Sequence, residues 1–328
     1  MTSIAVNEYN QAAASVPEDA LLGSLVWYTI SDVDILWEDA HTRLVDLDLD
    51  TSLLKPIRPV DAFRNATREL KRNFPASNGV KLNLMVRSKG HDEESAYRQL
   101  VWERVTTKGG QRRRLMYDPS AELTYHRNPP KIEVVRNHTP SGLDGDMSDE
   151  HRNWINDQLD ALPDRFRHLT RYLGNHKVRN LVREYLKSLG AVSVRESGGV
   201  YFVAQKHNDE LVRLGEWISG IGSAFHGTPL LDLVNQREML ARAFEEEAVR
   251  EVEALSKSID DILAGGGKVR ESTFDDFALR AAELTSKAKD YAEMLDIRSE
   301  IAHKRIDSFK RKTMELVDHI DYGKTGKA

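Results

Sequence analysis

The clearest pattern in the chain is a helical repeat of apolar residues in its last third. A first seam, with spacings of four, three, four and three, consists of Ala248, Val252, Leu255, Ile259 and Ile262. A second seam follows the glycines at 265–267 and consists of Phe274, Phe277, Ala281, Leu284, Ala288, Tyr291, Leu295, Ala302 and Phe309. Such seams mark the buried sides of helices that pack lengthwise. The pattern predicts an antiparallel helical hairpin or coiled coil over 230–321, with a glycine turn between two long helices.

The two predicted helices are unequal in length. Residues 230–263 and 272–320 would form rods of about 50 and 75 Å, so the tip of the longer rod would need a partner. Arg298 and Arg305 interrupt the second seam, which favours a short bundle over a long regular coiled coil. A plain intramolecular hairpin and an oligomer or partner interface both remain open. The residues expected at such an interface are Val252, Leu255, Ile259, Ile262, Leu284, Tyr291 and Leu295.

Upstream, residues 1–22 read as a flexible tail and residues 23–140 as an α+β domain. An apolar run at 25–30 predicts a strand, and Ser31 is the expected N-cap of a helix that buries Trp37 and its neighbours. A second helix is expected over 60–73. From 79 to 137 the apolar period changes to two, which predicts three to five antiparallel strands. The expected turns and linker lie at 108–111, 128–130 and 140–146.

A helical middle domain is expected over 148–226. Helices are predicted over 148–162, 163–173 and 176–189, followed by a β-hairpin over 191–204 and a fourth helix over 209–221. Three helices and a hairpin is the element order of a winged-helix module, in which the third helix reads nucleic acid. The fold class is therefore α+β: an N-terminal antiparallel sheet with helices, a winged-helix-like middle domain and a long C-terminal helical hairpin, with a short tail at 322–328.

The third helix of this middle domain carries a polar stripe that could contact nucleic acid. The candidate residues, including one in the predicted wing, are His176, Arg179, Asn180, Arg183, Lys187 and Arg195. A polar side is also what any amphipathic helix requires. The net charge of +3 over 151–227 is low for a DNA reader. Both interpretations remain open.

Composition limits the classes of function. The chain has 328 residues, a net charge of −5 and no cysteine, so disulfides and thiolate sites are excluded. It has no run of 18 apolar residues and no secretory signal pattern, and a cytoplasmic location without membrane contact is expected. The positive charge is concentrated in the middle, with +5 over 51–150 between acidic ends. The basic middle could bind a polyanion, or the basic and acidic segments could neutralise one another within the protein.

The known catalytic motifs are absent from the sequence. It has no GxxxxGK[ST] loop, no GxGxxG, no GxSxG and no HExxH, so no catalytic residue and no cofactor is predicted. Acidic residues cluster over 144–151, but they lack the spacing of a calcium loop and precede a helix, where acids are favoured anyway. No metal site is assigned. Whether the protein is an enzyme stays open, and the sequence favours a non-enzymatic role.

Three stretches together resemble a known family. They are Val26-Trp27-Tyr28-Thr29-Ile30-Ser31-Asp32, Pro59-Val60-Asp61-Ala62-Phe63-Arg64-Asn65-Ala66-Thr67 and Ser197-Gly198-Gly199-Val200-Tyr201-Phe202-Val203. They are similar to a family of uncharacterised proteins carried by phages and some prokaryotic genomes, over most of the chain up to about residue 225. The resemblance implies a phage or mobile-element origin and no activity, cofactor or site residue.

Three hypotheses on function follow. The first is an interaction or assembly protein that self-associates or docks a protein partner through the C-terminal helices. The second is a nucleic-acid-binding accessory protein that uses the middle domain. The third, a metal-dependent enzyme, has the least support in the sequence.

Overall fold

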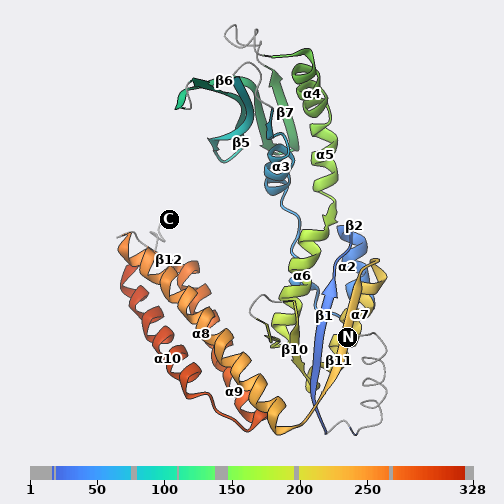
Figure 1. Cartoon of the computed structure of the whole chain (residues 1–328), viewed down its shortest axis with the longest axis vertical. Helices are drawn as coiled ribbons and strands as arrows, with labels where there is room; N and C mark the ends of the chain where they lie inside the picture. Colours follow the sequence, from blue (N-terminus) through green and yellow to red (C-terminus); the bar gives the residue numbers. More distant parts are fainter. Residues whose placement is uncertain are drawn as a thin grey trace, which may run out of the picture. The chain divides into compact units, whose positions relative to one another are not determined.

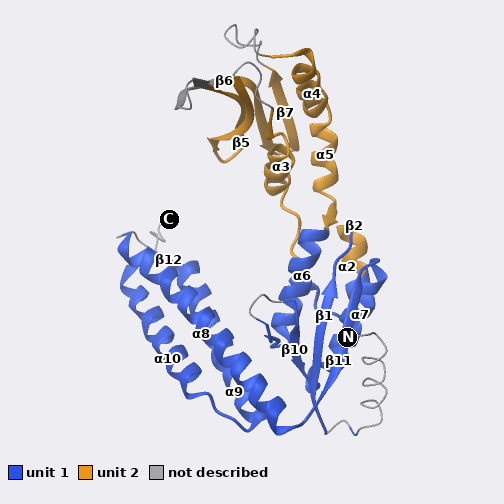
Figure 2. Cartoon of the chain, in the orientation of Figure 1, with its two compact units in different colours: residues 1–33, 43–53, 175–328 blue, residues 34–42, 54–174 orange. Residues whose placement is uncertain are grey.

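The structure is a computed structural model, and it describes residue 17 and residues 20–74, 80–108, 111–136, 147–195, 199–265 and 269–321. Figure 2 shows the two compact units into which the chain divides. Unit 1 contains residues 1–33, 43–53 and 175–328, and unit 2 contains residues 34–42 and 54–174. Both units combine helices with antiparallel sheets, which confirms the α+β class.

Unit 1 contains a four-stranded sheet whose strands come from distant parts of the chain (Figure 1). The strand order is β11-β1-β10-β9, and every neighbouring pair is antiparallel. The elements are β1 Leu21–Thr29, α6 Asn175–Ser188, β9 Val192–Ser193, β10 Tyr201–Ala204, η3 Gln205–His207, α7 Asn208–Gly220 and β11 Ala224–Leu231. This is the β-α-β-β-α-β connectivity of the split β-α-β fold. Unit 2 is inserted between its first strand and its first helix.

The two faces of this sheet are covered by different elements. Directly opposed residues share a face, so Leu25 lies beside Phe202 on one face and Val26 beside Tyr201 on the other. Helix α7 covers the face of Val26, where Gly215 approaches Phe225 so closely that an added Cβ would lie 2.9 Å from the ring. The opposite face packs through Leu25 and Phe202 against the C-terminal helices.

The C-terminal region of unit 1 is a bundle of three helices (Figure 1). Its elements are α8 Val234–Ala264, β12 Val269–Arg270, α9 Glu271–Leu295, α10 Glu300–Glu315, η4 Leu316–His319 and β13 Ile320–Asp321. The prediction of one helix over 272–320 is wrong. Asp296 adopts a left-handed conformation (φ 52°) that ends α9, and Ser299 caps α10 by accepting a hydrogen bond from the Ala302 N–H. Because α10 folds back onto α8 and α9, the predicted overhang does not exist.

The two predicted seams supply most of the bundle core. Phe277 meets Phe309 edge to face with 6.4 Å between ring centroids, and Phe244 stacks on Tyr291 at 5.0 Å. The bundle also continues into the core under the sheet, because Tyr291 meets Phe202 edge to face and its hydroxyl donates to the Gly190 carbonyl at 3.0 Å. Burial raises the pKa of Tyr291 well above its usual value, so this hydroxyl remains a donor. The bundle and the sheet therefore share one core.

Unit 2 is built on a five-stranded antiparallel meander in the order β3-β4-β5-β6-β7. The alternation predicted over 79–137 is confirmed, although residues 115–117 and 123–125 belong to one long strand, not to two. Helices α3, α4 and α5 supply apolar residues to the core on one face of the sheet, including Phe63, Ile155 and Phe166. The elements are β2 Asp34–Leu36, α2 Trp37–Asp46, η2 Thr51–Leu53, α3 Pro59–Arg68, β3 Arg72–Asn73, β4 Val80–His91, β5 Ser95–Lys108, β6 Gln111–Arg127, β7 Pro130–Arg136, α4 Asp149–Asp160, α5 Leu162–Leu169 and β8 Tyr172–Gly174, of which η2 and the end of α2 belong to unit 1.

Three predicted helix boundaries are wrong because strands replace the expected helix. The helix expected over 60–73 ends at Arg68, and residues 72–73 pair with β4 as strand β3. The helix expected from Ser31 begins at Trp37, and the helix expected over 163–173 ends at Leu169. The missing turns form the strands β2 and β8, which pair with each other between residues 34–36 and 172–174. Strand pairing between segments far apart in the chain outweighs the local helix signals there. By contrast, the predicted cap at Ser148 is confirmed, and a capping box with His151 completes it.

The elements of the expected winged-helix module are divided between the two units. Helices α4 and α5 pack in the core of unit 2, whereas α6 and the β9–β10 pair belong to unit 1. Residues 148–226 are thus not one compact unit. The tail predicted over 1–22 is too long, because Leu21 and Leu22 belong to strand β1. Residues 1–16, 18 and 19 of that tail, the predicted tail at 322–328, the linker at 140–146 and the turn residues 109–110, 197–198 and 266–267 lie outside the described residues.

Candidate functional site

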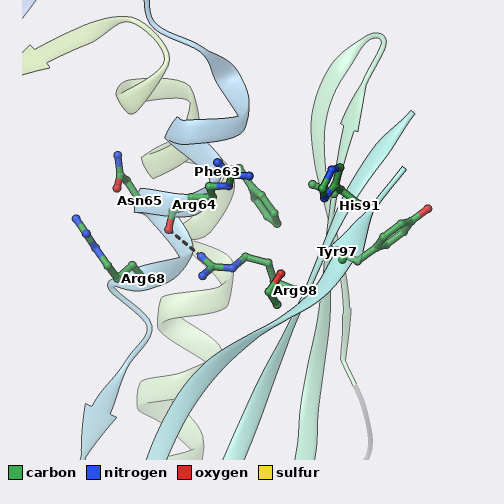
Figure 3. A pocket seen from close by; sticks show the side chains of 10 residues that line it. Phe63, Arg64, Asn65, Arg68, His91, Tyr97 and Arg98 are labelled. Carbon is green, nitrogen blue, oxygen red and sulfur yellow. Dashed lines mark hydrogen bonds between the residues drawn. The ribbon is translucent and has the colours of Figure 1, made fainter. Parts of the chain in front are cut away.

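The candidate site is a pocket of about 400 Å³ in unit 2, between helix α3 and the β4–β5 hairpin (Figure 3). Three arginines are among its lining residues. Figure 3 shows Arg98 extending from β5 toward α3, which carries Arg64 and Arg68, while Tyr97 points away from the helix. The residues that line the pocket are Phe63, Arg64, Asn65, Arg68, Ser88, Gly90, His91, Ala96, Tyr97 and Arg98.

The sequence of α3 places two of the arginines on its outer side. Pro59 begins the helix, where its missing N–H costs no hydrogen bond. Phe63 and Ala66 face the core, so Arg64 and Arg68, one helical turn apart, project to the exposed side.

Arg98 points toward α3 because the side chains of strand β5 point alternately to the two faces of the sheet. Ala96 and Leu100 lie in the core beneath α3, and Arg98, between them on the same face, reaches the end of that core. Its Nη1 donates to the Arg64 carbonyl at 2.9 Å and to Thr67 Oγ1 at 2.5 Å. Thr67 is buried, and its hydroxyl in turn donates to the Phe63 carbonyl at 2.7 Å. The guanidinium is therefore held in place by the backbone of α3.

The pocket has an excess of positive charge. None of the described residues that line it is acidic. Partial burial lowers the pKa of Arg98, and the charges of Arg64 and Arg68 lower it further. Among the described residues, Asp61 forms an ion pair with Arg64 at 3.2 Å on the helix surface and also pairs with Arg58. An exposed ion pair of this kind contributes little to the stability of the fold. An anion in the pocket would relieve the repulsion among the three cations.

A second cluster in unit 2 has the residue types of a catalytic triad. Ser95 Oγ lies 3.2 Å from His126 Nδ1, and His126 Nε2 lies 2.9 Å from Glu133 Oε2. Ser95, however, is only 4% exposed and does not line the pocket, and its backbone N–H is bound by Asp92. A nucleophile must reach its substrate next to oxyanion donors. We therefore interpret this cluster as a structural link across three strands.

The predicted nucleic-acid-binding residues lie in unit 1, apart from this pocket. His176, Asn180 and Arg183 form a chain of contacts along the exposed side of α6, with distances of 3.4 and 3.1 Å. Arg179 donates to the Ile30 carbonyl at 2.9 Å, and Lys187 lies 3.6 Å from Glu251 on α8. The exposed Arg195 lies in the β9–β10 connection, where its carbonyl accepts from Ser193. The structure thus joins His176, Asn180 and Arg183 by direct contacts on α6, which also carries Arg179 and Lys187, and places Arg195 outside that helix.

The predicted interface residues lie within the bundle. Val252, Ile259, Leu284, Tyr291 and Leu295 are buried there, and Leu255 and Ile262 pack against the same core. While the bundle is intact, these side chains contact one another, and a partner would have to use other residues.

Neither a metal centre nor a membrane span is found in the described part of the chain. Nowhere in those residues do three or more His, Asp or Glu side chains gather as metal ligands would, and the acidic residues 144 and 146 lie outside them. None of the described helices combines the length and apolar character that crossing a bilayer requires.

Comparison with known families gives one match. The model of a family of unknown function, DUF6744, matches residues 21–321, which is nearly the whole chain. The chain belongs to this family. No curated protein and no solved structure matches significantly. The expected resemblance to a family without assigned function is thereby confirmed, whereas the phage or mobile-element origin stays a prediction.

Proposed function

We propose that this DUF6744 protein binds nucleic acid and that the three-arginine pocket of unit 2 contacts backbone phosphates. The observation that supports the proposal is the presence of Arg64, Arg68 and Arg98 in the lining of one pocket that has no lining carboxylate. Guanidinium groups bind phosphate oxygens through paired, charge-assisted hydrogen bonds. Most contacts in protein–nucleic acid interfaces are made to the backbone.

The arrangement of the pocket suits a ligand that approaches from solvent. Arg64 is 57% exposed and Arg68 is also exposed, so both can turn toward a phosphate, whereas Arg98 is held by α3. One fixed and two mobile guanidinium groups can follow a chain of phosphates without base-specific geometry. This keeps the second of the hypotheses drawn from the sequence, nucleic-acid binding, and moves its main contact from α6 to unit 2.

The test is the salt dependence of binding. Fluorescence anisotropy of labelled DNA and RNA, titrated with the full chain at several salt concentrations, gives the slope of log K against log salt. Each neutralised phosphate contributes about −0.9 for duplex DNA and about −0.7 for single strands. Three arginine contacts therefore predict a slope of about −2 to −3. An affinity that does not change with salt, or no binding at low salt, would refute the proposal.

Self-association through the helical bundle is a second candidate function, which one observation favours. Exposed apolar side chains occur where the bundle helices meet: Leu233 and Val234 at the start of α8, Ile297 between α9 and α10, and Ile301 in the first turn of α10. The two places are linked because Arg237 donates to the Leu295 carbonyl at 3.2 Å. Light scattering over a range of concentrations tests this function. A dimer that Val234→Ser and Ile301→Ser dissociate supports it, and a monomer at every concentration contradicts it.

A further inference from the structure

Two tyrosines lie together on the face of the unit 1 sheet that the helices cover. Directly opposed residues share a face, so Tyr201 on β10 lies on the same face as Val26, and Tyr28, two residues further along β1, lies there too. The rings of Tyr28 and Tyr201 are stacked, with 6.3 Å between centroids and 14° between ring planes. Both side chains are only half-buried, so solvent reaches the pair.

Helix α6 places two arginines beside these tyrosines. Strands β1 and β9 are parallel because each is antiparallel to β10, and α6, which leads directly into β9, therefore runs back along β1. Arg179 Nη2 donates to the Ile30 carbonyl at 2.9 Å, which fixes this turn of α6 at the end of β1. Four residues of helix and two of strand have nearly the same rise, about 6 Å. Arg183 is therefore level with Tyr28.

The electrostatics of Tyr28 agree with this geometry. Burial raises the pKa of Tyr28, the neighbouring Tyr201 raises it further, and the charges of Arg183 and Arg179 oppose the shift. Tyr28 thus keeps its proton and can donate a hydrogen bond. The two tyrosine hydroxyls are bonded to each other, which uses one of their two hydrogens and leaves the other for a ligand.

The positive charge of this cluster is not neutralised by the chain. Both arginines are exposed, and among the residues that the structure describes neither forms an ion pair with a carboxylate. Arg179 binds the Ile30 carbonyl, and Arg183 Nη2 donates to Asn180 Oδ1 at 3.1 Å. Lys187, further along the same stripe, instead lies 3.6 Å from Glu251. Two cations and a neutral donor are therefore open to an anion from solvent.

We propose that Arg179 and Arg183, together with the hydroxyls of Tyr28 and Tyr201, form a second phosphate-binding site, in unit 1. Phosphate oxygens accept hydrogen bonds, and guanidinium groups bind them through paired, charge-assisted contacts. This inference rests on the proposed nucleic-acid-binding function and adds a backbone contact that is separate from the pocket of unit 2.

The experiment distinguishes the charged donors from the neutral ones. Binding of a fluorescein-labelled oligothymidylate of roughly 12 nucleotides is followed by anisotropy across a salt series, with full-length protein. Arg179→Ala/Arg183→Ala removes two charges, and Tyr28→Phe/Tyr201→Phe removes only the hydroxyls and keeps the rings. The matched control is Arg242→Ala/Arg250→Ala, which removes the same charge from exposed positions of α8 in unit 1.

The two kinds of variant are expected to differ in their salt dependence. The arginine variant weakens binding about tenfold and lowers the magnitude of the salt slope by about one to two, the part that this site adds to that of the pocket. The tyrosine variant weakens binding about threefold at every salt concentration with an unchanged slope, because no charge is removed. The control changes neither quantity.

One variant keeps the test decisive if the others lose stability. Thermal unfolding by circular dichroism identifies a misfolded variant, and loss of the bond from Arg179 to Ile30 is the most direct cause of one. Arg183→Ala then decides the outcome, since the hydrogen bond of Arg183 stays within α6. It should lower the magnitude of the slope by about one.

Three results separate this inference from the proposed function. Arginine and tyrosine variants that both bind like the control would overturn the second site and leave the pocket of unit 2 standing. An equal loss in the control would also overturn it, because any exposed cation would then act alike. Unchanged binding by Arg64→Ala/Arg68→Ala, together with the expected losses in the cluster variants, would refute the pocket and support the second site.

Discussion

The cations of the two units differ in what surrounds them. In unit 1, Lys287 lies 2.7 Å from Glu247 and also donates to the Ala191 carbonyl, and Arg237 binds both carboxylate oxygens of Asp232. These cations are satisfied by the chain itself and hold its elements together. The pocket of unit 2 has no carboxylate among its lining residues, and the charges of Arg64 and Arg68 act on Arg98 there. The comparison indicates that positive charge is structural in the first case and available for a ligand in the second.

Among the substitutions that test this difference between the units, we expect the largest change in stability at Lys287, which is 15% exposed. Lys287→Met leaves Glu247 without its cation and removes the hydrogen bond to Ala191, which joins the bundle to the sheet. We expect a loss of about 2–3 kcal/mol in the free energy of unfolding, measured with urea. Lys289→Met, which removes an exposed cation of the same helix, is the control. Equal effects of the two substitutions would contradict a structural role for Lys287.

A smaller effect of opposite sign is expected in the pocket. In the wild-type protein the arginines of the pocket repel one another, and Arg68→Glu places a carboxylate among them. This substitution should stabilise the free protein by about 1 kcal/mol at low salt. It should also weaken nucleic-acid binding. The stabilisation should disappear at high salt because the charges are exposed. Urea unfolding at both salt concentrations measures it. A loss of stability at low salt would show that the pocket has no excess of positive charge.

The smallest effect concerns the pair of Asp232 and Arg237, between β11 and α8. The hydrogen bonds from Arg237 lower the pKa of Asp232 below its ordinary value. A lowered pKa means stability that is present above the ordinary pKa and is lost as the pH falls through the folded value. Asp232→Asn should therefore flatten the loss of stability below about pH 4. Thermal unfolding between pH 7 and 3 measures it, and an unchanged acid profile would remove this pair from the stabilising contacts.

Local patterns predicted much of the fold. The apolar seams of 248–309 form a buried core, the alternation over 80–134 forms a sheet, and Ser148 caps its helix. Each of these depends on residues close in sequence. The break at Asp296 was missed because a seven-residue repeat does not reveal a single left-handed residue, although Arg298 on the apolar track was a signal of the break.

The connectivity and the site depend on contacts between distant residues, which no local pattern contains. Strand β1 pairs with β10 and β11, nearly two hundred residues away, so the inserted unit 2 was read as a continuation of one domain. Arg64 and Arg68 lie on the polar side of α3, which the helical period of the sequence alone defines. Arg98 was not singled out, because only the register between α3 and β5 shows that it meets them. The alternation of Ala96, Arg98 and Leu100 was the one available signal.

The central claim is that the three-arginine pocket of unit 2 binds phosphates, and a comparison of two arginine pairs tests it most directly. Arg64→Ala/Arg68→Ala and Arg167→Ala/Arg171→Ala remove the same charge from exposed positions of unit 2, and only the first pair lines the pocket. Nucleic-acid binding by both full-length variants is measured across a salt series. The account predicts a loss of about tenfold and a slope smaller by about two for the first variant only. Equal losses for both variants would contradict it.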